Sequence, residues 1–556
     1  MEKAQLRIWV SLMSTRTSES FIDSNLDYDV VVIGAGISGL YQLYCLREAG
    51  FRACILERGT GVGGTWYWNR YPGARFDSES YSYAYSFSEE LLEEWNWSEH
   101  FASQPEILRY LEYVADKFNL FKDIRFSCEV TKAQYMEEET CWQLILANGS
   151  TVSARILITA LGILSEPTFP NIEGINSFSG ESFHTGLWPK TPVTFEGKNV
   201  AVIGTGASGV QTIQEIAHEV RNLTVFQRRP NWCAPLNNSD IDVDEMNEIK
   251  ANYKDMFAIC SESHGGFIWT VDPRGTFEVT AAERVSFWEY LYASRGMSIW
   301  QGNFKDVLSD PVANKELSDF MANKIRQRIH DPEVAELLIP KDHGFGTRRV
   351  PLETKYYETY NQPNVDLIDL NRSPIRAISP KGVITSEGEY KVDTIIYATG
   401  FNAITGSFDR IDIRGASGQA LKEEWSSHLE TFLSVQVPDY PNLLMINGPQ
   451  GLGGNHPRNI EYSVEWVTSL LEHMKSRNLR RVEPSISAVQ TWSEHVRAKS
   501  GSALANKIDS WMTGINTNVP GKDKRVVGFR YGGSVQSYRL FCDSVAKGGY
   551  KEMIFS

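Results

Sequence analysis

The feature that most constrains the fold of this chain is a pattern that occurs twice, in which a short apolar run leads directly into a glycine-rich turn. In the first copy the run 29–33 (DVVVI) precedes 34–39 (GAGISG), and in the second the run 200–203 (VAVI) precedes 204–209 (GTGASG). Each turn is followed by helix-like apolar periodicity and then by a further apolar run, which is the order of a β-α-β unit. Strands as apolar as these lie in parallel sheets that helices cover on both faces. The sequence therefore predicts an α/β fold with two Rossmann-like units.

The first glycine turn has the residues that a bound dinucleotide requires. Gly34 permits the tight turn, Gly36 lets the backbone approach a pyrophosphate, and Gly39 permits close packing of the following helix, whose N-terminus presents free N–H groups. Glu57 closes the next apolar run, 23 residues after Gly34, where it can accept hydrogen bonds from ribose hydroxyls. A structural turn with a surface glutamate is the alternative. We expect a cofactor site here, with Ser38 among its contacts.

In the second unit, arginines stand where the first unit has a carboxylate. Arg228 and Arg229 follow the apolar run 223–226. A guanidinium can pair bidentately with the 2′-phosphate of NADPH, whereas a carboxylate would repel it; an exposed cationic strand end is the alternative. The two sites together predict FAD in the first unit and NADPH in the second, with electrons passing from nicotinamide to flavin. The expected NADP contacts in the second turn are Gly204, Thr205, Gly206, Ala207, Ser208 and Gly209.

Composition narrows the possible partners. The net charge of −14 argues against nucleic acid or an anionic membrane as the main partner, and no stretch is apolar enough to span a bilayer. The seven cysteines include no C-x-x-C pair and no metal-ligand spacing. We therefore expect no metal, no redox dithiol, and a reducing, cytoplasmic location. The missing cysteine pair also disfavours a disulfide reductase, which shares the two nucleotide domains.

A length of 556 residues predicts about two or three packed domains. Acidic segments in which apolar residues keep helical spacing predict a helical insertion; these residues are Leu317, Phe320, Met321, Ile325 and Ile329. The apolar runs 156–162 and 394–400 end in glycine, which suits strands where the chain crosses between domains. The expected division is an N-terminal extension (1–26), an FAD-binding domain (27–163 and 394–556), an NADP-binding domain (164–230 and 341–393) and the helical insertion (231–340).

The segment 63–77 (GGTWYWNRYPGARFD) is unusually aromatic for a loop. Packing within an Ω-type loop would explain most of these aromatic residues. The alternative is that the loop covers the isoalloxazine ring and excludes water, while Asp77 and an arginine from elsewhere form a charge pair near the reacting ring.

Between the two units, the stretch 178–189 (FSGESFHTGLWP) matches the pattern F-x-G-x-x-x-H-x-x-x-W-P. With the two flanking glycine motifs, it resembles the fingerprint of the type I Baeyer–Villiger monooxygenases. The segments 63–83, 95–119 and 345–357 and the unit that begins at Gly204 resemble the branch of phenylacetone monooxygenase and its close relatives. The resemblance covers nearly the whole chain after about Tyr28. It implies an NADPH-dependent flavin monooxygenase that converts linear, aryl or cyclic ketones to esters or lactones with O2 via a C4a-peroxyflavin, with some sulfoxidation.

The resemblance also assigns site residues. By the match of 344–349 (GFGTRR), it places the active-site arginine on Arg349, with Asp77 as the carboxylate that pairs with it. Arg348 would contact the 2′-phosphate, and Trp511 would approach the nicotinamide on a mobile loop. Further cofactor contacts are expected at Thr65, Trp66, Tyr83 and Val130.

Several points stay open at the level of sequence. His184 and Trp188 of the fingerprint are expected to couple domain motion rather than to take part in chemistry. A sibling flavoprotein that oxygenates amines or sulfides, and a scaffold without enzymatic activity, are the alternatives. The segment 448–457 departs from phenylacetone monooxygenase, so the substrate range is the least transferable feature. The oligomeric state is expected to be a monomer or a weak oligomer.

Overall fold

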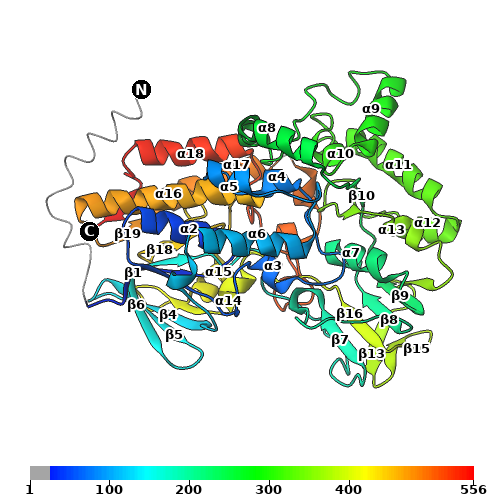
Figure 1. The fold of residues 1–556 in the computed structure, drawn as a ribbon, viewed down its shortest axis with the longest axis horizontal. Coiled ribbons are helices and arrows are strands. Elements are labelled where there is room, and N and C mark those ends of the chain that lie inside the picture. Colours follow the sequence, from blue (N-terminus) through cyan, green and yellow to red (C-terminus); the bar gives the residue numbers. More distant parts are fainter. Residues whose placement is uncertain (1–24, 502) are drawn as a thin grey trace.

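The computed structural model describes residues 25–501 and 503–556, so most of the predicted N-terminal extension lies outside the described residues. The chain forms two α/β sheets that lie side by side, with helices packed over them (Figure 1). No helix of the described part is long and apolar enough to cross a membrane.

The first sheet joins strands from both ends of the chain. Its eight strands run in the order β17-β4-β5-β6-β1-β2-β3, with β18 also beside β6. At its centre β1 (Tyr28–Ile33) pairs in parallel with β2 (Ala53–Leu56) and with β6 (Thr151–Thr159). The other strands are β3 (Ile124–Arg125), β4 (Val130–Met136), β5 (Cys141–Leu146), β17 (Asp412–Arg414) and β18 (Leu443–Met445). The apolar run that predicted β1 is buried from Val30 to Ile33, as a central parallel strand requires.

The second sheet is entirely parallel and has the order β12-β9-β8-β16-β7. Its strands are β7 (Glu181–His184), β8 (Asn199–Ile203), β9 (Asn222–Gln227), β12 (Val365–Asp369) and β16 (Thr394–Tyr397). An antiparallel three-stranded sheet accompanies it, formed by β13 (Ile375–Ser379), β14 (Gly382–Thr385) and β15 (Glu389–Lys391). The predicted strand, glycine turn and helix of the second unit are present as β8, the turn 204–206 and α7 (Ala207–Ile216).

One expected boundary requires a correction. The division of the chain put residue 394 at the start of the returning FAD-binding segment, but β16 pairs with β7 and β8, with Thr394 opposite Val200. The strand therefore belongs to the second sheet, and the chain returns to the first sheet only after it. The apolar run predicted a buried strand but could not say which of two equally apolar sheets would accept it. The other boundaries stay predictions.

Helices cover both sheets. Over the first sheet, α2 (Ile37–Glu48) packs against α16 (His456–Arg477). The other helices of this part are α3 (Thr65–Trp68), α4 (Ser80–Tyr83), α5 (Glu89–Glu94), α6 (Gln104–Lys117), α14 (Gly406–Asp409), α15 (Leu421–Ser427), α17 (Ile486–Ser500) and α18 (Val535–Lys547). The short pair β19 (Val482–Pro484) and β20 (Met553–Phe555) lies near the C-terminus.

The region predicted as a helical insertion is helical. It holds α8 (Val243–Glu262), α9 (Ala281–Ala293), α10 (Ser298–Gln301), α11 (Pro311–Arg328) and α12 (Pro332–Leu338). Its helices begin at capping residues: Thr280 and Glu283 form a capping box on α9, and Asp310 caps α11, where Pro311 occupies the first turn. Leu317, Met321 and Ile325 lie on the buried face of α11, as their spacing predicts. Phe320 is only half-buried, and Ile329 is buried but follows the last residue of the helix.

Candidate active site

A cavity of about 630 Å³ is lined by the first glycine turn at one end and by the predicted catalytic pair at the other. This volume lies in the range of cofactor and ligand sites. The predicted residues that line it are Gly34, Gly36, Ser38, Glu57, Thr65, Trp66, Asp77, Tyr83, Val130, Arg349 and Trp511. The structure thus brings residues from five separate segments of the chain to one space.

The geometry of the first turn explains its glycines. Gly34 has a φ of +106°, and a Cβ there would lie 2.6 Å from the carbonyl oxygen of Ala160. A Cβ at Gly39 would lie 1.8 Å from the carbonyl oxygen of Gly34, so Gly39 supports the turn from within rather than lining the cavity. The close packing brings the N-terminus of α2 to the cavity at Gly36 and Ser38. A helix N-terminus beside a glycine turn is suited to a pyrophosphate, so these residues fit FAD.

Glu57 is buried at the end of β2 and holds the turn as well as facing the cavity. Its two carboxylate oxygens accept hydrogen bonds from the N–H groups of Ala35 and Gly59, each at 2.7 Å. A carboxylate has further acceptor positions beyond these two. The alternative of a surface glutamate is therefore wrong, and the ribose contact stays a prediction.

The aromatic loop packs into the core of the protein, and its expected position over the isoalloxazine ring stays a prediction. Trp66 and Phe76 pack edge to face at 5.2 Å, and Phe76 contacts Tyr83 with ring centroids 4.1 Å apart. The indole N–H of Trp66 donates to the hydroxyl of Tyr83 at 3.1 Å. All three side chains also line the cavity. The loop is thus part of the core and one apolar wall of the cavity.

Asp77 and Arg349 form an ion pair on the cavity wall. The side chain of Asp77 is 7% exposed, and its second oxygen, Oδ1, has no hydrogen-bond partner among the described residues. Burial raises the pKa of Asp77, and the charge of Arg349 opposes that shift. The Nη1 of Arg349 also donates to the carbonyl of Val350 at 3.0 Å. The guanidinium is therefore held from two sides, with its position fixed relative to the cavity.

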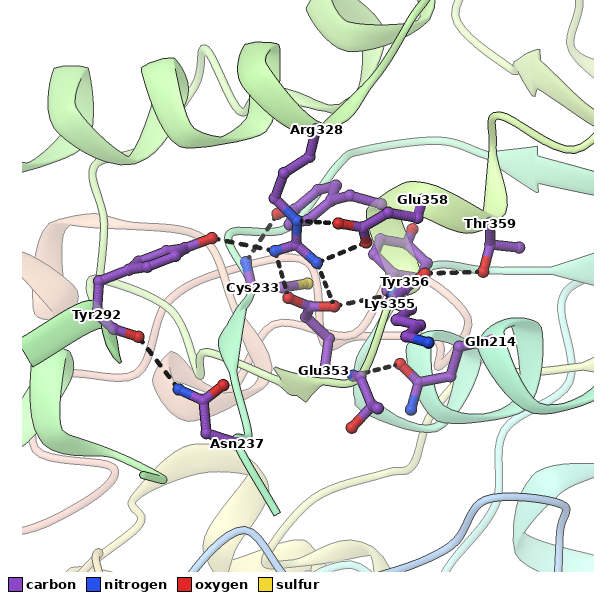
Figure 2. A network of polar contacts seen from close by, with 12 residues as sticks. Gln214, Cys233, Asn237, Tyr292, Arg328, Glu353, Lys355, Tyr356, Glu358 and Thr359 are labelled. Carbon is purple, nitrogen blue, oxygen red and sulfur yellow. Dashed lines mark hydrogen bonds and ion pairs between the residues drawn. The ribbon is translucent and has the colours of Figure 1, made fainter. Parts of the chain in front are cut away.

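The segment that carries Arg349 is anchored by a partly buried network around Arg328, the last residue of α11 (Figure 2). Arg328 binds Glu353 at 2.6 and 3.0 Å and Glu358 at 2.6 and 2.7 Å, and it also donates to the hydroxyl of Tyr292 at 3.0 Å. Glu353 ends β11 (Leu352–Glu353), which pairs with β10 (Ala234–Pro235), and Glu358 lies in α13 (Tyr356–Thr359). The helical insertion thus fixes the strand that follows Arg349.

The second glycine turn lies apart from this cavity, at the N-terminus of α7. Gly206 has a φ of −80°, which any residue adopts. Apart from its chain neighbours, no heavy atom of the described residues lies within 4 Å of a Cβ built there. Neither backbone nor packing explains this glycine, whereas a phosphate that approaches the helix N-terminus would. Gly204 and Gly209 instead pack closely, each against a neighbouring backbone carbonyl, and Ala207 opens the helix.

The predicted phosphate-binding arginines gather beside this turn. Arg229 and Arg348 share one carboxylate, Asp342, at 3.9 and 3.2 Å. Burial and then the charges of Arg229 and Arg348 lower the pKa of Arg228. The turn contacts the same segment, because the hydroxyl of Thr205 donates to the carbonyl of Arg229 at 3.0 Å. Three guanidinium groups with one shared carboxylate form a fitting site for a dianionic phosphate, so these residues fit NADP.

The fingerprint residues lie at the edge of the second sheet. Ser208 of the turn hydrogen-bonds Thr185 at 3.0 Å, directly after His184. The Nδ1 of His184 accepts from the N–H of Gly186 at 3.0 Å, and burial lowers the pKa of His184 to about 4. Trp188 packs between the rings of Phe183 and Phe195, and is buried. The expected role in domain motion stays a prediction.

No sequence motif indicated two of the residues that line the cavity, His456 and Arg530. Burial, and then the charges of Arg530 and Arg349, lower the pKa of His456 to about 4. Both residues lie in glycine-rich segments, 451–456 and 529–533. A single charged residue within such a segment is the signal that could have identified Arg530. In the described part of the chain no cluster of His, Cys, Asp and Glu could hold a metal ion.

Comparisons with known proteins agree with this geometry. Residues 27–241 match the family described as flavin-binding monooxygenase-like. The 2-oxo-Δ3-4,5,5-trimethylcyclopentenylacetyl-CoA monooxygenase of Pseudomonas putida is 43% identical over 94% of this chain and 97% of its own length. A Baeyer–Villiger monooxygenase of Pseudooceanicola batsensis is 38% identical over 95% of this chain and 96% of its own. The crystal structure of OTEMO in complex with FAD and NADP superposes with a TM-score of 0.91 at 42% identity, covering 96% of this chain and all of that one.

Proposed function

Because the chain belongs to the Baeyer–Villiger monooxygenases, we propose that Asp77 and Arg349 are its catalytic pair and that the cavity beside them receives the flavin ring and the ketone. The protein is an FAD- and NADPH-dependent monooxygenase that oxidises ketones to esters or lactones with O2. The observation that carries the proposal is the ion pair itself, which lies on the wall of the cavity that contains the first glycine turn.

The chain's own groups supply position and charge. When bound, NADPH provides a hydride and FAD accepts it and activates dioxygen. Oxygen insertion builds negative charge at the ketone oxygen, and a guanidinium, which stays protonated, stabilises that charge. Asp77 holds Arg349 in one orientation, so little reorganisation is needed during the reaction. The apolar wall formed by Trp66, Phe76 and Tyr83 keeps water from the reacting atoms.

The second site binds NADPH. Gly206 and the N-terminus of α7 approach its pyrophosphate, while Arg228, Arg229 and Arg348 bind the 2′-phosphate. Trp511 lines the cavity from the segment 510–514 and is the residue that we expect to contact the nicotinamide when the site closes.

Several finer assignments complete the proposal. The substrates are linear, aryl or cyclic ketones, with some sulfoxidation, because a pocket wall that is largely apolar admits many shapes. Within the family we place the chain near phenylacetone monooxygenase, on the segments 63–83 and 345–357. The seven free cysteines favour a reducing, cytoplasmic location, and we expect a monomer or a weak oligomer.

A ketone panel tests the function. The FAD-loaded protein is mixed with NADPH in air and with linear, aryl and cyclic ketones, and products are identified by mass spectrometry. We expect an ester or lactone one oxygen atom heavier than the ketone, and its loss in Arg349→Ala. Arg372→Ala, which removes an arginine whose side chain is 75% exposed, is the control and should keep activity. If ketones stay intact while sulfides or amines are oxygenated, the chain is instead a flavoprotein that oxygenates amines or sulfides. Arg349 then does not stabilise a ketone oxygen.

A further inference from the structure

Arg530 brings a positive charge to the cavity that no group of the described chain neutralises. Its side chain forms no ion pair and no hydrogen bond among the described residues, in contrast to Arg349, which has Asp77. Burial alone lowers the pKa of Arg530, with no carboxylate to oppose it. A partly buried guanidinium without a counter-charge is costly, so proteins retain one mainly where a ligand supplies the anion.

The surroundings of Arg530 hold it in place. Its guanidinium lies 5.8 Å from the ring centroid of Trp511, within range of a cation–π contact. On another side it lies against Gly453, where a Cβ would be only 1.4 Å from Nη2. Gly453 has no left-handed φ, so its glycine is explained by the room that the arginine needs. The guanidinium thus occupies a space that the loop 448–457 is shaped to leave open.

Arg530 lies close to the proposed reaction site. Arg530 and Arg349 both act electrostatically on His456, whose Nδ1 is buried without a partner in the described structure. The imidazole and both arginines line the wall of a single cavity. Because Asp77 neutralises Arg349, the net positive charge of this region is that of Arg530. A ligand bound in this cavity therefore meets both guanidinium groups, Arg349 with its counter-charge and Arg530 without one.

We propose that Arg530 is a specificity-determining residue that binds a carboxylate on the substrate, so that the preferred substrates are ketones with a carboxylate a few carbons from the carbonyl. The planar guanidinium offers two parallel N–H groups, which match a carboxylate. The inference rests on the proposed function, in which Arg349 marks the position of the carbonyl. Gly453, in the loop before α16, makes room for the guanidinium of Arg530.

Matched substrates test the proposal. The holoenzyme is given 2-oxocyclopentaneacetate and its neutral amide, and the kcat/KM of lactone formation is measured for each. Charged hydrogen-bond pairs in desolvated sites support a preference for the acid of about 100-fold. Arg530→Met should remove most of this preference by raising the KM for the acid while leaving the amide unchanged within a few-fold. Arg530→Lys should retain part of it.

A control and a binding measurement separate the possible outcomes. Arg497→Met removes an exposed arginine of α17, which pairs with Glu430 at 2.7 Å, and should keep the preference. Cyclopentylacetate, which has no ketone, should perturb the flavin spectrum on binding and inhibit the wild type but not Arg530→Met. This titration reports anion binding even if no ketone is converted.

Three results would overturn the proposal. One is equal kcat/KM for the acid and the amide in the wild type, which leaves ketone oxidation intact and removes only this inference. Another is an equal loss for both substrates in Arg530→Met, together with a higher KM for NADPH, which would assign Arg530 to the cofactor. The third is cyclopentylacetate binding that Arg530→Met does not weaken. If neither ketone reacts, the cyclopentylacetate titration still decides this proposal, and the broad ketone panel decides the proposed function separately.

Discussion

At the scale of single residues, the cofactor sites depend on glycines whose reasons differ. Gly34 and Gly204 have φ values of +106° and +110°, so the backbone itself requires glycine there. Gly206 has an ordinary φ and open space around it, so neither the backbone nor packing requires its glycine, and we expect it to leave room for NADPH. The sequence motif treats these positions alike, whereas the structure separates the glycines that shape the turn from the one that does not.

This difference predicts opposite effects for two similar substitutions. Gly206→Ala should leave the free energy of unfolding within about 1 kcal/mol of the wild type, because alanine suits both the φ and the space. It should raise the Kd for NADPH by at least about tenfold, because the methyl group meets the phosphate. Gly204→Ala should instead destabilise the fold by more than the roughly 1–2 kcal/mol of a left-handed alanine, because its Cβ would also lie 2.5 Å from the carbonyl oxygen of Ala398.

Denaturant unfolding and NADPH titration check both variants. Equal losses of stability, or NADPH binding by Gly206→Ala as tight as that of the wild type, would contradict this account of the second site.

At the scale of elements, the sequence predicted those helices and strands that short, local sequence patterns specify. The apolar runs and glycine turns predicted β1 with α2 and β8 with α7, and helical spacing predicted the buried face of α11. Pairing across long distances is not encoded in such signals. For that reason β16 was assigned to the wrong sheet, and the anchoring of the Arg349 segment by Arg328 was not foreseen.

The Arg328 network predicts that two arginines of α11 contribute differently to the stability of the protein. Arg328→Met should lower the free energy of unfolding by about 3–5 kcal/mol, because it leaves Glu353, with a side chain 1% exposed, without its counter-charge. Arg326→Met on the same helix is the matched control. Its ion pair with Glu336 is exposed on both sides, so the expected loss is about 1 kcal/mol or less. Equal losses for the two variants, measured by denaturant unfolding with FAD bound, would show that the network does not anchor this segment.

At the scale of the whole molecule, the site is assembled from segments distant in sequence. The ion pair between Asp77 and Arg349 could be predicted from the sequence because both residues lie in motifs that resemble a known family. His456 and Arg530 lie in no such motif, and the folded cavity is what brings them together with Arg349. The cofactors were therefore predictable from sequence, whereas the charge on the wall of the cavity depends on tertiary packing.

Buried histidines make the stability of the whole molecule dependent on pH. The pKa of His184 is lowered to about 4 in the folded protein, against about 6.5 for an exposed histidine. Between these two values the unfolded chain binds more protons, so stability is full above about pH 6.5 and is lost as the pH falls toward 4. The share of His184 is on the order of 3 kcal/mol, and His456 adds to it in the same direction.

Glu79 opposes this trend, because burial raises its pKa to about 7 and its stabilising contribution is lost as the pH rises from about 4.5 to 7. Comparing the wild type with His184→Gln isolates the share of the histidine. We expect the unfolding free energy of His184→Gln to fall less between pH 6.5 and 4.5, and an identical pH dependence in both proteins would contradict the assignment.

The central claim is that Asp77 and Arg349 act as one catalytic unit. A double-mutant cycle tests it most directly, with the rate of ester formation per bound FAD measured for the wild type, Asp77→Ala, Arg349→Ala and the double variant. Each single substitution should cost about 100-fold or more, and the double variant should be no slower than Arg349→Ala within a few-fold, because residues that act as a unit do not add. Losses that multiply in the double variant, or full activity in Asp77→Ala, would contradict the claim.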